Sequence, residues 1–124
     1  DLRKMGLIDY FDYILSADLL DRYKPNPSGL IYLLNRFKTD KRDAIYIGDM
    51  PVDVITAKLA GIDSCAVSTG LGNIKSLRWA KPNFVFKDYN EIIRAYQAWY
   101  CPTTSSLFCS IYFCCLSSKL IYYF

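Results

Sequence analysis

The chain has 124 residues, a length that suits one domain of ordinary size. Its net charge of +3 comes from Lys and Arg residues scattered along the sequence, which argues against a nucleic-acid-binding surface. The absence of histidine excludes histidine-based zinc sites, Ser-His-Asp triads and Cys-His dyads.

The cysteines bear on the redox compartment. Their spacing matches neither a paired CxxC zinc site nor a disulfide framework. No amino-terminal signal peptide is visible in the sequence, so we expect reduced thiols and a cytoplasmic location. The first residue is Asp1 rather than a methionine, which is typical of a fragment or a processed product. The five cysteines are Cys65, Cys101, Cys109, Cys114 and Cys115.

Apolar runs that suit strands alternate along the chain with segments that suit helices. This alternation predicts an α/β protein with a doubly wound, Rossmann-like, mostly parallel sheet and right-handed crossovers. The predicted strand at 44–47 should pair in parallel with the predicted strand at 64–67. The predicted strands lie near residues 13–16, 44–47, 64–67 and 83–86. The predicted helices lie near residues 27–37, 51–60, 73–79 and 90–99.

A Lys-Pro-Asn-Pro sequence precedes the first predicted helix. Pro25 biases Lys24 towards an extended backbone, because a residue before proline avoids the helical region. Asn26 is a good N-cap and Pro27 suits the first helical position. Taken alone, Lys24 equally suits a solvated loop lysine.

The second predicted strand leads into the part of the chain that carries the candidate site. Gly48 allows a sharp turn, and Pro51 suits the start of the following helix. Asp49 therefore follows the carboxyl end of a strand and Asp53 lies in the first helical turn, at the edge where α/β sheets bind ligands. A glycine-bearing loop at 68–72 should reach the same edge. Two carboxylates that face one small volume repel each other, and a Mg²⁺ ion removes that conflict. The alternative is structural: one aspartate ends a strand and the other stabilises a helix N-terminus.

Four motifs follow one another in a recognisable order. They are Gly-Leu-Ile-Asp-Tyr-Phe-Asp at 6–12, Lys-Pro-Asn-Pro at 24–27, Gly-Asp-Met-Pro-Val-Asp at 48–53 with Ala-Lys-Leu-Ala-Gly at 57–61, and Lys-Pro-Asn-Phe-Val-Phe at 81–86. Over roughly Leu2 to Ile93, the chain resembles the carboxyl-terminal half of the haloacid dehalogenase superfamily of phosphohydrolases. The resemblance is to its phosphoglycolate-phosphatase-like branch.

The resemblance implies an activity and roles for three residues. In this family an aspartate nucleophile attacks a phosphoryl group, forms an aspartyl-phosphate and releases it to water, with Mg²⁺ as cofactor. Lys24 matches the family lysine that neutralises the phosphoryl oxygens and the nucleophile, so the resemblance implies a catalytic and substrate-binding role for it. Asp49 matches the Mg²⁺ ligand, and Asp53 matches its partner, which supports the metal through water or hydrogen bonds. The substrate implied is a small phosphorylated metabolite.

The chain departs from the family pattern in what it lacks. The nucleophile motif and the second motif, a Ser or Thr, would lie before Asp1, and the cap domain that selects the substrate is absent. We therefore expect a truncated sheet without its central nucleophile strand, and an isolated chain without turnover. Two alternatives stay open. One is a non-catalytic module that binds phosphate or metal, or that pairs with another chain supplying the missing amino-terminal half. The other is a tail-anchored, membrane-associated chain.

Composition changes near the end of the last predicted helix. We expect residues 1–97 to form the hydrolase-like unit and residues 98–124 to be a hydrophobic tail outside it. The tail is rich in Cys, Ser, Tyr and Phe, and Lys119 is its only charged residue. Residues 107–124 have about the length of a membrane-spanning helix. The interspersed serines, Lys119 and the adjacent Cys114 and Cys115 make this segment a poor candidate for one. Aggregation through β-structure and a packed terminal strand are further interpretations. We favour a tail that is foreign to the domain.

Overall fold

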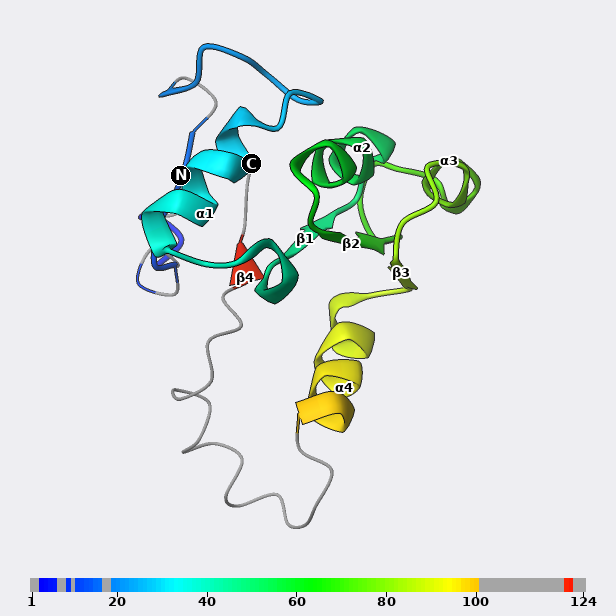
Figure 1. Cartoon of the computed structure of the whole chain (residues 1–124). Coiled ribbons are helices and arrows are strands. Elements are labelled where there is room, and N and C mark those ends of the chain that lie inside the picture. The colour runs from blue at the N-terminus through cyan, green and yellow to red at the C-terminus, as the bar shows by residue number, and fades with distance from the viewer. Residues whose placement is uncertain (1–2, 7–8, 10, 17–18, 101–119, 122–124) are drawn as a thin grey trace.

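The computed structural model describes residues 3–6, 9, 11–16, 19–100 and 120–121. Figure 1 shows the chain with its helices and strands labelled. The helices are α1 (Ser28–Phe37), α2 (Pro51–Ala60), α3 (Ile74–Trp79) and α4 (Tyr89–Tyr100). The strands are β1 (Ile45–Gly48), β2 (Asp63–Val67), β3 (Phe84–Phe86) and β4 (Leu120–Ile121). A short 3₁₀ turn, Lys41–Asp43, precedes β1.

The strands form one parallel sheet in the order β3-β2-β1-β4. In its centre β1 pairs with β2 in parallel, with Tyr46 opposite Ser64 and Gly48 opposite Ala66. This confirms the predicted α/β class and the predicted parallel pairing. Strands β1, β2 and β3 and the four helices begin and end within one residue of their predicted positions.

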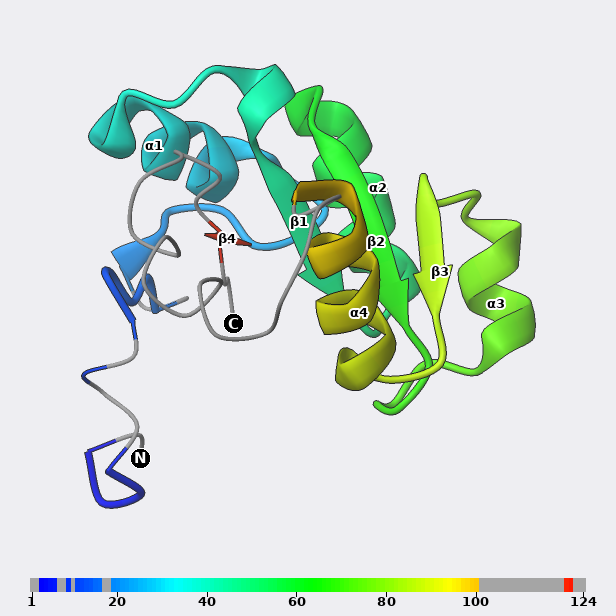
Figure 2. The same cartoon turned by 90° about the horizontal axis from the view of Figure 1, so that it is seen from below.

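Helices cover both faces of the sheet. In Figures 1 and 2, α1, α2 and α3 lie on one side of β1 and β2, and α4 lies on the other. Ile47, Cys65 and Val67 are buried on the α4 face, where Ile92 of α4 packs against them. A parallel strand with helices on both faces must be apolar on both faces, which explains the continuous apolar run in β1.

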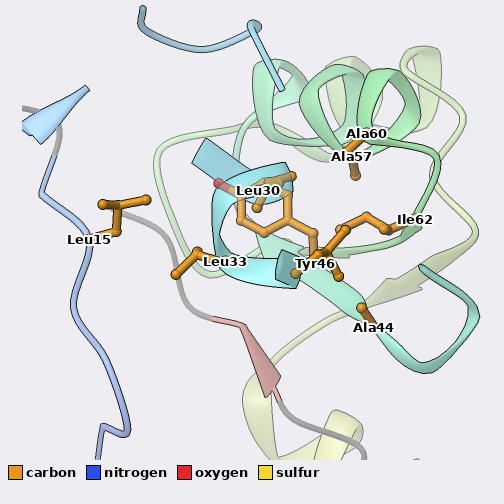
Figure 3. Close-up of a cluster of buried hydrophobic side chains, with 9 residues drawn as sticks. Leu15, Leu30, Leu33, Ala44, Tyr46, Ala57, Ala60 and Ile62 are labelled. Atoms are coloured by element: carbon orange, nitrogen blue, oxygen red, sulfur yellow. The ribbon is translucent and has the colours of Figure 1, made fainter. Parts of the chain in front are cut away.

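The larger buried cluster lies between α1, β1 and α2. Figure 3 shows the ring of Tyr46 lying among the leucines of α1, with Ala57 and Ala60 of α2 above the strand. Leu30 and Leu33 are 0% and 1% exposed, and full burial of such a side chain contributes about 1.5–3 kcal/mol. Small alanines on α2 let this helix approach the sheet closely, so the start of α2 is fixed relative to the end of β1.

The predicted strand at 13–16 is wrong: these residues form no strand in the structure. Leu15 is nevertheless buried against the α1 side of the core, and Tyr13 packs on Phe37. The apolar pattern of residues 13–16 therefore predicted correctly that Leu15 is buried, although it predicted the wrong secondary structure. A strand also needs a neighbour for its N–H and C=O groups, and the edge of β1 away from β2 pairs with β4 instead.

Part of the predicted tail falls within the described residues. Helix α4 continues to Tyr100, and Leu120 and Ile121 pair with Ile45 and Tyr46. The rest of the tail, including Cys101, Cys109, Cys114, Cys115 and Lys119, lies outside the described residues. No helix in the described ranges combines the length and the apolar character that crossing a membrane requires.

Candidate functional site

The candidate site lies where β1 ends and α2 begins. Asp49 follows Gly48, the last residue of β1, and Asp53 is in the first turn of α2 after Pro51. This is the carboxyl end of the parallel strands, as the sequence predicted. Gly48 is required there, because a Cβ atom on it would lie 2.4 Å from the Cβ atom of Asp53.

The Asp53 carboxylate is buried and surrounded by donors. It is 5% exposed. Its Oδ1 accepts hydrogen bonds from Lys24 Nζ at 2.9 Å and from the Tyr46 hydroxyl at 3.0 Å. Its Oδ2 accepts the Met50 backbone N–H at 3.1 Å. Three donors from three different segments therefore fix this carboxylate, and two of them meet at one oxygen.

Lys24 reaches the site from a distant part of the chain. Its side chain is 21% exposed, and its ammonium forms an ion pair with Asp53, which lies 29 residues further on. The same ammonium lies 5.4 Å from the centroid of the Tyr46 ring, within the range of a cation–π interaction. The Lys24–Pro25 peptide bond is cis. Asn26 Oδ1 accepts the Ser28 N–H at 3.0 Å, so it stabilises the start of α1, which begins one residue later than predicted.

Asp49 is held by the loop after β2. Its Oδ2 accepts the Leu71 N–H at 2.7 Å. Gly70 makes this approach possible, because a Cβ atom there would lie 1.8 Å from Asp49 Oδ2. The prediction that the glycine-bearing loop at 68–72 reaches the same edge is confirmed. The Leu71 side chain itself is 90% exposed.

Tyr46, which the sequence pattern did not indicate, also lies at the site, since its hydroxyl donates to Asp53. Burial raises the pKa of the Tyr89 phenol at the start of α4, and the negative charge of Asp49 adds to the effect. Tyr46 was read only as an apolar strand residue. A tyrosine in a fully buried strand is the signal that could have found it, because a buried hydroxyl needs a hydrogen-bond partner.

One of the two carboxylates has an oxygen that could bind a hard cation such as Mg²⁺. Among the described residues, the hydrogen bond from Leu71 goes to Oδ2 of Asp49, and no hydrogen bond involves its Oδ1. Both oxygens of Asp53 already accept protein hydrogen bonds. Asp49 is thus the side chain suited to bind Mg²⁺ directly, with Asp53 in a supporting position. No group of three His, Cys, Asp or Glu residues gathers in the described part of the chain.

The fold is that of an α/β protein with a parallel sheet, and the candidate site lies at the carboxyl end of β1. The model of the haloacid dehalogenase-like hydrolases matches residues 1–67, more than half of the sequence. The chain therefore belongs to this family.

Known phosphatases are among its relatives. A phosphoglycolate phosphatase of Neisseria meningitidis is 32% identical over 99 residues, which are 77% of this chain and 42% of that protein. The pyrophosphatase PpaX of Halalkalibacterium halodurans is 27% identical over 92 residues, 74% of this chain and 43% of that protein. The crystal structure of a predicted phosphoglycolate phosphatase from Haemophilus somnus superposes with a TM-score of 0.71 at 25% identity. That match covers 77% of this chain and 43% of the other. The chain thus spans about two fifths of the length of the relatives it matches.

Proposed function

We propose that this chain supplies the lysine and metal-binding half of a Mg²⁺-dependent phosphatase site that acts on small phosphorylated metabolites. The observation that carries the proposal is the contact between Lys24 and Asp53, next to Asp49, at the carboxyl end of β1. Relatives named as phosphoglycolate phosphatases and pyrophosphatases support the substrate class.

Each residue has a role that its surroundings support. Lys24 would neutralise the oxygens of a phosphoryl group, because its ammonium is fixed at this end of the sheet by Asp53 and is still partly exposed. Asp49 would bind Mg²⁺, and Asp53 would support that ion while it holds Lys24. When bound, Mg²⁺ would stabilise the negative charge that develops on the phosphoryl group.

In the complete family protein, the reaction passes through an aspartyl-phosphate on an aspartate that this sequence does not match. A lysine and a metal-binding carboxylate provide no such nucleophile. We therefore propose that the isolated chain has no turnover, and that catalysis needs the nucleophile-bearing half of a family protein. The length of the relatives favours this complementation, because the residues that match this chain are only about two fifths of each relative.

The test is a phosphatase assay with p-nitrophenyl phosphate and Mg²⁺. The isolated chain should give no rate above background. Addition of a separately expressed amino-terminal half of a related phosphatase should restore hydrolysis to the parent chain but not to Lys24→Met. Hydrolysis by the isolated chain that depends on Lys24 would contradict the proposal, and so would equal restoration in Lys24→Met.

A further inference from the structure

The hydroxyl of Tyr46 lies inside the core but points at the site. Tyr46 is 1% exposed and belongs to β1, the central strand, while its ring packs among the leucines of α1. A tyrosine at such a position loses its water, so its hydroxyl must find a protein acceptor. The acceptor is Oδ1 of Asp53, at 3.0 Å.

The same oxygen also accepts the hydrogen bond of Lys24. Two donors that converge on one carboxylate oxygen restrict its rotation, because the carboxylate can satisfy both only in one orientation. The Met50 N–H on the other oxygen completes the restriction. The Lys24 ammonium also lies over the Tyr46 ring, with Nζ 5.4 Å from the ring centroid. The tyrosine is thus linked to the lysine in two ways: through the Asp53 oxygen that both hydrogen bonds share, and through its ring.

We infer that Tyr46 is a positioning residue: it orients Asp53 and thereby fixes the ammonium of Lys24 where a phosphoryl group would bind. This inference rests on the proposed function for the meaning of Lys24, but the geometry that it invokes can be tested without any ligand. A buried core residue would then have a direct role in the site. Tyr46 of β1 would fix the position of the Lys24 ammonium, which belongs to an irregular segment 22 residues earlier in the sequence.

The informative substitution is Tyr46→Phe, which keeps the ring and removes only the hydroxyl. Because phenylalanine brings no polar group, the change leaves no buried donor without a partner. Asp53 keeps its backbone bond from Met50 and loses the hydroxyl that orients Oδ1. Lys24 should then leave the carboxylate more often.

The measurement is the rate at which acetic anhydride modifies Lys24, determined by mass spectrometry and divided by the rate for Lys58. The Lys58 ammonium donates to the Ala80 carbonyl, and this lysine lies on the same helix as Asp53, so it reports opening of α2. In Tyr46→Phe the Lys24-to-Lys58 ratio should rise about fivefold, the change expected for one lost hydrogen bond of ordinary strength. The matched control is Tyr13→Phe, which removes a tyrosine hydroxyl bonded to Tyr32 and should leave the ratio unchanged.

An unchanged ratio in a folded Tyr46→Phe chain would overturn the inference. A parallel rise at both lysines would overturn it too, because it would show a merely structural role. The proposed function fails separately: if the ratio rises in Tyr46→Phe while the parent chain binds no Mg²⁺ at Asp49, the positioning role stands and the phosphatase assignment does not.

A second measurement decides the question if Tyr46→Phe does not fold. With ¹³C-labelled tyrosine in equal volumes of H2O and D2O, a slowly exchanging hydroxyl splits the Cζ signal into two lines. The Tyr46 signal should be split in the parent chain, and it should stay split in Lys24→Met, because the bond from Tyr46 to Asp53 does not need the lysine. A single averaged line in the parent, or loss of the splitting in Lys24→Met, would overturn the inference.

Discussion

Replacement of Asp53 by asparagine should destabilise the fold as well as the site. The carboxylate accepts hydrogen bonds from Lys24 and Tyr46 on Oδ1 and from Met50 on Oδ2. An asparagine side chain has one acceptor oxygen and one donor nitrogen, so one of these positions would place a donor against a donor. The ion pair with Lys24 is lost in the same change.

The expected cost follows from burial. A hydrogen bond to a charged group contributes about 1.5–3 kcal/mol, and a buried donor left without a partner costs about 1–3 kcal/mol. Because the carboxylate is only 5% exposed, water cannot replace these partners. We expect the free energy of unfolding to fall by about 3 kcal/mol, a large share of the roughly 5–15 kcal/mol of a typical domain. For a domain of this size that loss lowers the melting temperature by about 12–24 °C.

The assay is urea unfolding and thermal melting followed by circular dichroism. The matched control is Asp63→Asn, because Asp63 is exposed and accepts one hydrogen bond, from Asn83 Nδ2 at 2.8 Å. A surface change of this kind should stay within about 0.5 kcal/mol of the parent. If Asp53→Asn melts with the parent, or if both variants lose the same stability, the assignment of Asp53 as the anchor of the site is refuted.

Further predictions concern the site, the core and the tail. Gly70→Ala should weaken Mg²⁺ binding about tenfold, a change worth about 1.4 kcal/mol, because its Cβ atom would displace Asp49; calorimetric titration that gives the parent affinity would contradict this. Burial raises the pKa of the Cys65 thiol to about 12, so iodoacetamide at pH 8.5 should modify Cys65 far faster in urea than in the folded chain. The folded state binds the Cys65 thiol proton more tightly than the unfolded state does. The stability that this thiol contributes should therefore be constant below its ordinary pKa of 9.0 and fall as the pH rises to about 12. A melting temperature that rises over this range would contradict the burial of Cys65 as a neutral thiol. Removal of residues 101–124 should improve solubility and leave a cooperative melt in place, since the core described between α1, β1 and α2 contains no residue of this segment; a truncated chain without a cooperative transition would show that the tail belongs to the fold.

The sequence predicted those parts of the fold that depend on local pattern. The apolar run before Gly48 and the proline at the start of α2 determine where Asp49 and Asp53 lie, and the structure has both at that point. The segment at 13–16 shows the limit of such reasoning: its apolar residues are buried, but whether a segment pairs in a sheet depends on a neighbour that its own sequence does not contain.

The site shows the same division between local and long-range information. The contact of Lys24 with Asp53 was not predicted, because no local pattern relates residues 29 positions apart. The family resemblance indicated only that both residues serve the same site. Tyr46 was missed because alternation and propensity treat a tyrosine in a strand as one more apolar residue. Its hydroxyl acquires a role only when α2 brings the Asp53 carboxylate to the face of β1 that carries the ring.

The central claim is that Asp49 binds Mg²⁺ at the end of β1, beside Lys24 and Asp53. The most direct test is a Mg²⁺ titration of the isolated chain observed by NMR at the aspartate side chains and the Leu71 amide, whose N–H donates to Asp49. We expect saturable shifts centred on Asp49 and Leu71 that disappear in Asp49→Asn and persist in Asp63→Asn. Shifts of equal size in Asp49→Asn and the parent chain, or no saturable shift in the parent, would contradict it.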